Sequence, residues 1–353
     1  MPTPTTMSAA SDAGEINLHA QQKEQGRASD YEDTDIDSAY GDSVASSTAS
    51  LSASVLEDCK INGRTYHCKR SRGQSWNPND EKHCEALDIL HGVSILMQDG
   101  KLYLADLGDN HRVRWLKVLD VGCGTARSDF ADSHPLAEVI GIDISARQLP
   151  DSDLPLNVRF DVDDITEAWT YPPNTFHYVH VRWLTGSIED WIALYKEIFK
   201  ALKPGGTFEH KESSCMIRID NGTRDPQSAL AKWGKMFISA GQKSGRTFAV
   251  VEDDIQREAM EAAGFIDIRV VNFKVPIGSW SADEKGKSIG AAVDRALQAD
   301  PEGFINRPWG ESLGWEEDKM MVYAAYLRNE LKAGKSHAWC SMKVVIGKKP
   351  YTD

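Results

Sequence analysis

Lys117-Val-Leu-Asp-Val-Gly-Cys-Gly-Thr125, followed by Val139-Ile-Gly-Ile-Asp-Ile-Ser145, is the stretch that decides the fold. Its first apolar run is typical of a strand buried on both faces of a parallel sheet. Gly122 and Gly124 then allow a tight turn and a close approach of the backbone to a ligand, because neither has a Cβ. The second run ends in Asp143, 21 residues after Gly122. A carboxylate at that spacing can accept hydrogen bonds from both ribose hydroxyls, so the stretch predicts an adenosine site.

The residues around the turn indicate which adenosine compound binds. A dinucleotide site needs a third glycine, but here Gly122-Cys123-Gly124 is followed by Thr-Ala-Arg127. Asp120, just before the turn, would repel a pyrophosphate, whereas it can accept hydrogen bonds from the ammonium group of an amino acid. S-adenosylmethionine has that group and no phosphate, so it is the predicted cofactor. The alternative is an ordinary strand-to-helix turn without a ligand.

Two further segments carry candidate site residues. The predicted strand from Val158 ends in Asp163, Asp164 and Ile165, which have the chemistry to bond an adenine amine and pack on its face. A solvated acidic loop is the alternative for these three. The next predicted strand, Phe176 to Trp183, should open at the ligand edge, because ligands of open α/β sheets bind outside the carboxyl ends of the strands.

That strand places His180, Arg182 and Trp183 at the predicted edge. His180 is the candidate base for a hydroxyl acceptor, because histidine titrates near neutral pH. The alternative is that His177 and His180 are strand residues with satisfied hydrogen bonds. After it, Lys203-Pro-Gly-Gly206 ends a helix and begins a strand, which is a structural device and not a site.

These motifs resemble the class I S-adenosylmethionine-dependent methyltransferases, and more closely their LaeA-like fungal group. The similarity to that group includes Asn62-Gly-Arg-Thr-Tyr-His67, Ser187-Ile-Glu-Asp-Trp191, Gly245-Arg-Thr-Phe248 and Pro276-Ile-Gly-Ser-Trp280, and covers roughly residues 59 to 350. The resemblance implies an α/β Rossmann-like fold, a seven-stranded sheet with helices on both faces. It also implies an enzyme that transfers a methyl group from S-adenosylmethionine.

One segment departs from the family pattern. Ala126-Arg127-Ser128 leads directly into Asp129-Phe-Ala-Asp132, about two residues short of the usual helix. A deletion of that size would rotate the following side chains by roughly 200°, given 3.6 residues per turn. Arg127 would then lie where an apolar contact belongs. A functional cofactor site and a degenerate one are the two alternatives.

Charge is unevenly distributed along the 353 residues of the chain, whose formal net charge is −13. Eleven acidic residues but only Lys23 and Arg27 lie in residues 1–58. This stretch is rich in Ser and Thr and poor in aromatic residues, so residues 1–57 are predicted to be a disordered acidic tail. The acidity excludes direct nucleic-acid binding, which needs a basic face. A solvating role for the tail is the simpler interpretation, and recruitment of a partner is the other.

The composition also predicts the compartment. No apolar run approaches the roughly 18 residues of a membrane-spanning helix, and residues 1–20 do not resemble a signal peptide. The six cysteines include no Cys-x-x-Cys pair, so we expect free thiols in a reducing compartment and no metal site. A cytoplasmic protein is expected, and a nuclear one is the alternative.

The remainder, residues 58–353, is predicted to be one methyltransferase domain in three segments. Residues 58–112 form a helical cap, with a helix from Asp80 to Met97 capped by Asn79 or Asp80. Residues 113–211 form the cofactor-binding core. Residues 212–353 form substrate insertions, a helix over Met320 to Leu331 and a closing strand over Ala338 to Ile346. Aromatic residues are the candidates for an apolar acceptor pocket, with packing of the insertions as the alternative: Trp183, Trp233, Trp280 and Trp309.

Two functions follow from the resemblance. In the first, the protein methylates a small molecule of fungal secondary metabolism. In the second, it is a regulator of secondary metabolism that acts through velvet-type protein partners, with weak or no catalysis. The aromatic insertions favour the first, and the short helix after the glycine turn favours the second.

Overall fold

A computed structural model describes residues 58–68, 74–108, 116–124, 129–145, 155–220 and 225–351. The predicted acidic tail, residues 1–57, lies outside these residues. So do Ala126 and Arg127, where the shortened helix was inferred. The predicted division of residues 58–353 into three segments stays a prediction.

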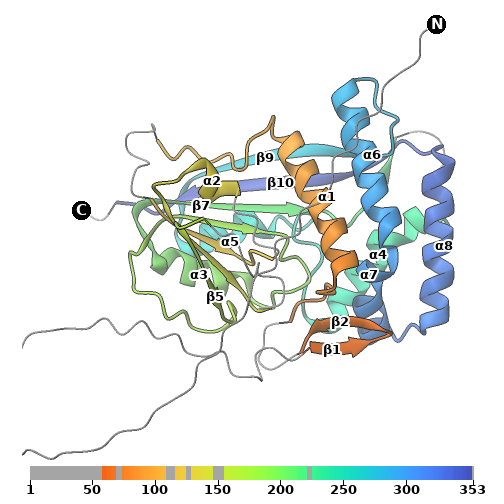
Figure 1. Cartoon of the computed structure of the whole chain (residues 1–353), viewed down its shortest axis with the longest axis horizontal. Helices are drawn as coiled ribbons and strands as arrows, with labels where there is room; N and C mark the ends of the chain where they lie inside the picture. The colour runs from red at the N-terminus through yellow and green to blue at the C-terminus, as the bar shows by residue number, and fades with distance from the viewer. Residues whose placement is uncertain are drawn as a thin grey trace, which may run out of the picture. The chain divides into compact units, whose positions relative to one another are not determined.

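One mixed sheet dominates the described part of the chain (Figure 1). Its long strands follow the order β5-β4-β3-β6-β7-β10-β9, and the two-residue strand β8 also pairs with β10. Seven long strands in this order confirm the predicted class I methyltransferase fold. The strands are β3 (Lys117–Val121), β4 (Glu138–Asp143), β5 (Val158–Val162), β6 (Phe176–Arg182), β7 (Leu202–Ser213), β8 (Arg218–Ile219), β9 (Ile266–Ile277) and β10 (Ala338–Lys348).

Strands β3 to β7 pair in parallel, whereas β10 runs antiparallel to both β7 and β9. The predicted central strand is buried on both faces, since Val118, Leu119 and Val121 are at most 1% exposed. All five parallel strands present their carboxyl ends to one edge, where a ligand site is expected.

Helices cover both faces of this sheet (Figure 1). The helices α3 (Trp191–Ala201) and α5 (Ile255–Ala263) pack on one face through an apolar cluster that includes Ile198 and Met260. The short helix α2 (Asp129–Ser133) packs on the other, through Ala131. The strand β7 begins directly after α3, and Gly205 has a φ of +75°, as the predicted Pro-Gly-Gly break requires.

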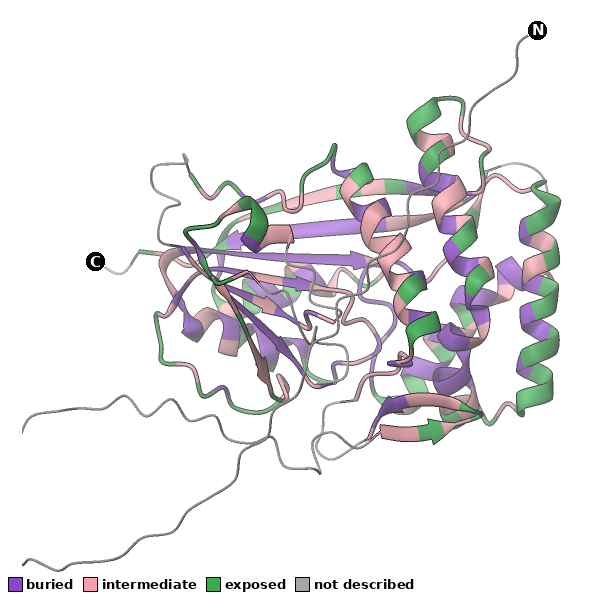
Figure 2. Ribbon diagram, in the orientation of Figure 1, coloured by how far each residue is buried: buried purple, intermediate pink, exposed green. Residues whose placement is uncertain are grey.

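A second group of helices lies beside the carboxyl ends of the parallel strands (Figure 1). Their inner surfaces are buried, and the outer surface of α8 is exposed (Figure 2). The predicted C-terminal helix and strand correspond to α8 and β10, and Asp80 caps α1 as predicted, its side chain accepting a hydrogen bond from the His83 amide. The group comprises α1 (Glu81–Met97), α4 (Ala229–Ser244), α6 (Glu284–Ala299), α7 (Pro301–Arg307), the π-helix η4 (Pro308–Ser312) and α8 (Glu317–Ala333).

A hairpin of β1 (Asp58–Ile61) and β2 (Arg64–His67) is tied to these helices by a cluster of charges. Arg64 bonds the carboxylates of Asp80 and Asp300 at 2.6 and 2.8 Å. Since Asp80 caps α1 and Asp300 caps α7, one guanidinium connects the hairpin to the starts of two helices. We call Arg64, Asp80, His83 and Asp300 the clasp.

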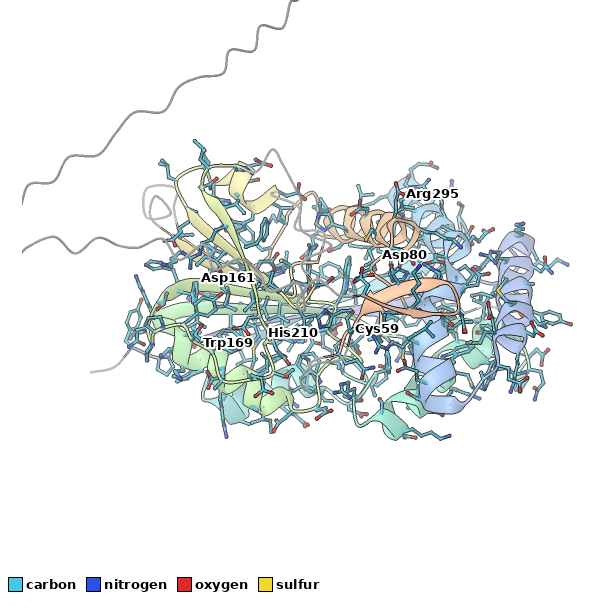
Figure 3. All side chains as sticks on the ribbon, turned by 60° about the horizontal axis from the view of Figure 1, so that its bottom comes forward. Cys59, Asp80, Asp161, Trp169, His210 and Arg295 are labelled. Carbon is cyan, nitrogen blue, oxygen red and sulfur yellow. A yellow bond between two sulfur atoms is a disulfide. The ribbon has the colours of Figure 1, made fainter. Side chains whose placement is uncertain are left out.

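The expectation of six free cysteines is wrong for the hairpin, because Cys59 and Cys68 form a disulfide (Figure 3). The antiparallel pairing brings their Cα atoms to 5.1 Å, a contact that their spacing in the chain does not reveal. The other four cysteines form no disulfide within the described residues. No helix in the part of the chain described here has the length and apolar character needed to cross a membrane.

Candidate active site

The glycine turn follows β3 as predicted. The amides of Gly122 and Cys123 donate hydrogen bonds to the carbonyl of Ile142, at 2.8 and 3.2 Å, which ties the turn to the end of β4. Both glycines have positive φ, +68° for Gly122 and +60° for Gly124. A Cβ on Gly122 would clash with Leu184, whereas a Cβ on Gly124 would project into open space. The turn therefore leaves room for a ligand at Gly124.

Asp143 lies beside this turn at the end of β4. Its Oδ2 accepts a hydrogen bond from the Gly124 amide, and its Oδ1 accepts one from the Ser145 amide, both at 2.9 Å. Burial raises the pKa of the carboxyl group, although these two amides act in the opposite direction. Each oxygen retains a lone pair, so the carboxylate can still accept hydrogen bonds from a ligand.

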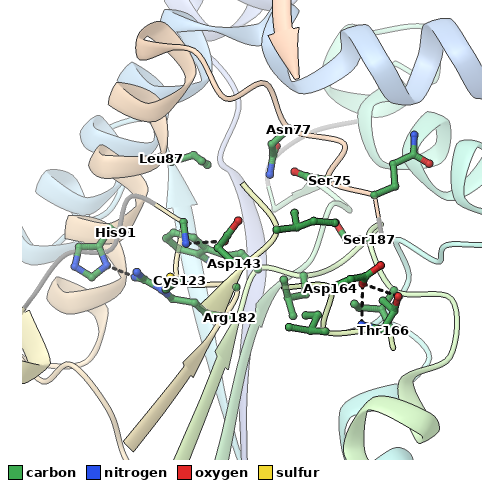
Figure 4. A pocket seen from close by; sticks show the side chains of 18 of the residues that line it. Ser75, Asn77, Leu87, His91, Cys123, Asp143, Asp164, Thr166, Arg182 and Ser187 are labelled. Carbon is green, nitrogen blue, oxygen red and sulfur yellow. Dashed lines mark hydrogen bonds between the residues drawn. The ribbon is translucent and has the colours of Figure 1, made fainter. Parts of the chain in front are cut away.

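A cavity with an empty volume of about 960 Å³, open solvent included, extends from this turn along the strand ends (Figure 4). We call it the edge cavity. The turn and Asp143 form one part of its wall, and Asp164 and Ile165 form the next. The Oδ1 atom of Asp164 accepts hydrogen bonds from the amide and hydroxyl of Thr166, which orient the carboxylate.

Helix α1 and the end of β6 close the edge cavity on the side opposite Asp164 (Figure 4). There Arg182 donates a hydrogen bond to Nδ1 of His91, so His91 carries its hydrogen on Nε2 and donates it to Asp129 at 2.7 Å. The guanidinium also lies 5.5 Å from the centre of the Trp183 ring. The cavity thus contains a cation held in place by its neighbours.

A second cavity, which we call the apolar cavity, lies between α1, α4, α6 and the strands β7, β9 and β10. Its wall consists mostly of aromatic and aliphatic side chains, including Trp76, Trp233 and Phe237. Both cavities share Asn77, Leu87 and Trp183 as lining residues. A molecule in the apolar cavity can therefore approach one in the edge cavity at these three side chains.

Trp183, at this junction, has a φ of +53°. Positive φ is an outlier for a bulky residue and is maintained only where the surroundings enforce it. Here the Trp183 amide donates a hydrogen bond to the carbonyl of Lys211, which extends the β6–β7 pairing by one residue. The strain turns the chain at the point where the two cavities meet.

Comparisons with known proteins identify the family of this chain. A family model described as a methyltransferase domain matches residues 90–268. The methyltransferase pytC of Aspergillus terreus is 32% identical over 87% of this chain and 92% of its own. The secondary metabolism regulator LAE1 of Cochliobolus heterostrophus is 33% identical over 82% of this chain and 94% of its own. This chain belongs to the LaeA-like methyltransferase family. Its methyl donor is S-adenosylmethionine.

A solved structure of phosphoethanolamine N-methyltransferase 2 from Haemonchus contortus, with bound S-adenosylhomocysteine, is also similar to this methyltransferase. The identity is 21%, the match covers 76% of this chain and 53% of that one, and the TM-score is 0.41.

The edge cavity of the methyltransferase fits the cofactor chemically. It contains open space at Gly124, carboxylates at Asp143 and Asp164, an apolar side chain at Ile165 and the cation Arg182. Cys123 also lines it, and burial raises the pKa of its thiol well above the usual range, so it is no nucleophile here. Eight of the predicted cofactor or pocket residues thus line one cavity: Gly122, Cys123, Gly124, Asp143, Asp164, Ile165, Arg182 and Trp183.

Three predicted site residues lie outside the wall of the edge cavity. Asp163 is exposed, and its Oδ1 accepts a hydrogen bond from the amide of Asp164. Asp120 and His180 bond each other at 3.0 Å and line a neighbouring cavity on the α2 face of the sheet, which shares His91, Cys123 and Arg182 with the edge cavity. Both side chains therefore lie next to the edge cavity.

The roles of His180 as the base and of Asp120 as the partner of an ammonium group stay predictions. Burial raises the pKa of Asp120, but the hydrogen bond from His180 and the charge of Arg182 outweigh it, and the pKa lies below its usual value. His177 accepts a hydrogen bond from the Lys117 amide at 2.9 Å, as the alternative interpretation of a satisfied strand residue requires.

The four candidate tryptophans also differ in whether they line a cavity of the site. Trp183 and Trp233 line the apolar cavity. Trp280 does not: its indole donates a hydrogen bond to the carbonyl of Ala338 at 2.8 Å and stacks on His337. Trp309 is fully buried in the core of the helical group. Trp280 and Trp309 are therefore packing residues, which was the alternative interpretation.

The sequence analysis missed several residues of the apolar cavity. Trp76 and Asn77 precede α1. Thr185 follows the end of β6, and Glu212 lies near the end of β7. The rule that ligands bind at the carboxyl ends of parallel strands, applied to β7 as it was to β6, would have found Glu212. In the portion of the chain described, no three His, Cys, Asp or Glu side chains gather closely enough to hold a metal ion.

Proposed function

We propose that this methyltransferase transfers a methyl group to a largely apolar small molecule of fungal secondary metabolism. The observation that carries the proposal is the junction of the two cavities at Asn77, Leu87 and Trp183. One cavity has the polar groups that an adenosyl amino acid needs, and the other has the aromatic wall typical of sites for apolar ligands.

The edge cavity would hold the cofactor through its own residues. Asp143 would accept hydrogen bonds from the ribose hydroxyls, while Asp164 and Ile165 would contact the adenine. Arg182 offers a cation for the carboxylate of the cofactor. Bound there, S-adenosylmethionine supplies an electrophilic methyl group. The chain then has to align the acceptor and exclude water, which accounts for the packed aromatic wall.

Calorimetric titration of the purified full-length chain with S-adenosylmethionine and S-adenosylhomocysteine tests the cofactor half of the proposal. We expect micromolar binding that Asp143→Ala weakens at least 100-fold. Asp163→Ala is the matched control, because this exposed aspartate lies outside the cavity and should bind both ligands as the wild type does. Wild-type protein that binds neither ligand would contradict the proposal and favour the degenerate site.

The acceptor is tested with methyl-labelled S-adenosylmethionine and fractionated extract of a fungal culture. We expect the label in the small-molecule fraction extracted by organic solvent. Several relatives are named secondary metabolism regulators, so a regulatory function through protein partners is the second candidate. A stable complex with a velvet-type protein, together with no labelled small molecule, would favour that candidate.

A further inference from the structure

The wall of the apolar cavity contains two polar side-chain atoms without a hydrogen-bond partner among the described residues. They are Oγ1 of Thr185 and Oε2 of Glu212, and both atoms are buried. No other residue of this cavity has a buried side-chain nitrogen or oxygen in that condition. A buried polar atom without a partner is costly, so a native protein that retains one usually has a use for it.

Glu212 is held firmly by its other oxygen. Oε1 accepts hydrogen bonds from the amides of Leu184 at 2.6 Å and Thr185 at 3.1 Å. The ring of His210 lies on the same strand, with Nε2 at 3.1 Å from this oxygen. Three contacts on one oxygen leave the carboxylate a single orientation, and the residue as a whole is fully buried.

The protons of this cluster can be assigned. Burial raises the pKa of Tyr195 well above its usual value, so the phenol keeps its hydrogen and donates it to Nδ1 of His210. Burial also lowers the pKa of His210, since it outweighs the attraction of Glu212. The neutral ring therefore carries its hydrogen on Nε2 and donates it to Oε1 of Glu212 (His210 is labelled in Figure 3).

Thr185 is fixed next to Glu212. Its amide donates to Oε1 of Glu212, and its carbonyl accepts a hydrogen bond from the indole of Trp76 at 2.7 Å. The backbone on either side of the hydroxyl is thus restrained. The two unpartnered oxygens belong to residues that are in direct contact through the Thr185 amide and that both line the apolar cavity.

We propose that Glu212 and Thr185 form the polar anchor of the apolar cavity and recognise a hydroxyl group of the acceptor. A hydroxyl donates one hydrogen bond and accepts others, so it can donate to Oε2 of Glu212 and accept from Oγ1 of Thr185. The acceptor class is a largely apolar molecule with a free hydroxyl. The inference rests on the proposed function, because it assigns the acceptor to this cavity.

A pair of probes tests this anchor: 2-naphthol, which has an apolar ring system and one hydroxyl, and 2-methoxynaphthalene, which lacks the donated hydrogen. Each is titrated calorimetrically into the full chain saturated with S-adenosylhomocysteine. We expect wild-type protein to bind 2-naphthol at least tenfold more tightly. Glu212→Gln should reduce that ratio to about twofold or less, because the amide replaces the accepting oxygen with a donor. Thr185→Val should reduce it partially.

Glu252→Gln is the matched control. Glu252 also has a buried Oε2 without a hydrogen-bond partner within the described residues, but it lies outside the cavity. This variant should keep the wild-type ratio. Equal affinity of wild-type protein for the two probes, or an unchanged ratio in Glu212→Gln and Thr185→Val, would overturn the anchor while leaving the proposed function intact.

S-adenosylhomocysteine binding is measured on every variant and separates the two proposals. Wild-type protein that binds neither S-adenosylhomocysteine nor a probe would overturn the proposed function and the anchor together. Thermal unfolding of each variant verifies that it is folded. If Glu212→Gln does not fold, Thr185→Val decides the question, since valine has nearly the same shape as threonine and lacks only the hydroxyl.

Discussion

The edge cavity and the apolar cavity are built in different ways. Gly122, Gly124 and Asp143 form the edge cavity through backbone turns and amide hydrogen bonds between neighbouring strands. The apolar cavity takes its wall from α1, α4, α6, α7 and three strands, whose residues lie far apart in the chain. The first can therefore be recognised from local sequence, whereas the second depends on how distant helices dock.

A substitution in the clasp should have the largest effect, because it should lower the unfolding free energy and leave cofactor affinity nearly unchanged. Arg64→Met removes one charged partner of the fully buried Asp300, which keeps Lys82 at 3.2 Å and His83 at 2.9 Å. A buried charge left without any partner costs about 3–5 kcal/mol, so this partial loss should cost about 3 kcal/mol of unfolding free energy. Chemical denaturation measures this loss. Cofactor affinity at a temperature where the variant is folded should stay within twofold of wild type, because none of the four clasp residues lines the edge cavity.

Arg159→Met is the control for the clasp. Arg159 pairs with Glu138 at 3.2 Å, but both side chains are about half exposed, and such surface pairs contribute about 1 kcal/mol or less. If Arg64→Met costs no more than this control, the helical group does not depend on the clasp.

Gly124→Ala should act on the edge cavity alone. The new methyl group meets no atom of the described residues within 4 Å and projects into the space assigned to the cofactor. We expect calorimetry to show a loss of about 100-fold in affinity for S-adenosylhomocysteine, or about 2.7 kcal/mol. Gly100→Ala is the matched control, because Gly100 has a φ of +83° and equally open space around its Cβ position.

Both glycine variants carry the backbone cost of a left-handed alanine, about 1–2 kcal/mol of stability. Only Gly124→Ala should lose affinity. An equal loss in both variants would mean that the backbone, and not occupancy of the cavity, accounts for the effect.

Two buried histidines, one in the clasp and one on β7, should make the stability depend on pH. Burial lowers the pKa of both His83, in the clasp, and His210, beside the apolar cavity, below the usual value of 6.5. As the pH falls below 6.5, the unfolded chain binds these protons and the native protein does not. The free energy of unfolding should therefore decrease, by up to about 1.4 kcal/mol per pH unit for each histidine.

Denaturation at intervals from pH 7 to about pH 5 measures this slope, and His210→Gln should remove one histidine's share of it. A slope that does not change in the variant would show that His210 is protonated in the native protein, contrary to the assignment above.

Trp280→Phe has the smallest expected effect. It removes the hydrogen bond to Ala338 and should cost about 1 kcal/mol of stability, while 2-naphthol binding stays unchanged. Trp233→Ala, by contrast, removes part of the wall of the apolar cavity and should weaken 2-naphthol binding. Comparable losses in 2-naphthol affinity in the two variants would contradict the assignment of Trp233 to the cavity wall and of Trp280 to a position outside it.

Local patterns accounted for the cap at Asp80, the glycine turn, the end of β4 at Asp143 and the closing strand, all of which the structure contains. The same patterns did not reveal the contact between Asp120 and His180. Both lie near strand ends, and only the register of β3 against β6 pairs them, in a cavity beside the edge cavity. A strand reverses the direction of successive side chains, so a shift of one residue decides which side chain meets a ligand.

Local sequence was enough to predict the class I fold and the glycine turn, because glycines, strand ends and their spacing act over a few tens of residues. The wall of the apolar cavity, in contrast, follows from the three-dimensional packing. This packing placed Trp183 and Trp233 in the cavity wall and Trp280 outside it. It also brought Glu212 against Thr185 and left one oxygen of each without a partner among the described residues. Such choices depend on contacts between segments distant in the chain, which no local pattern of residues records.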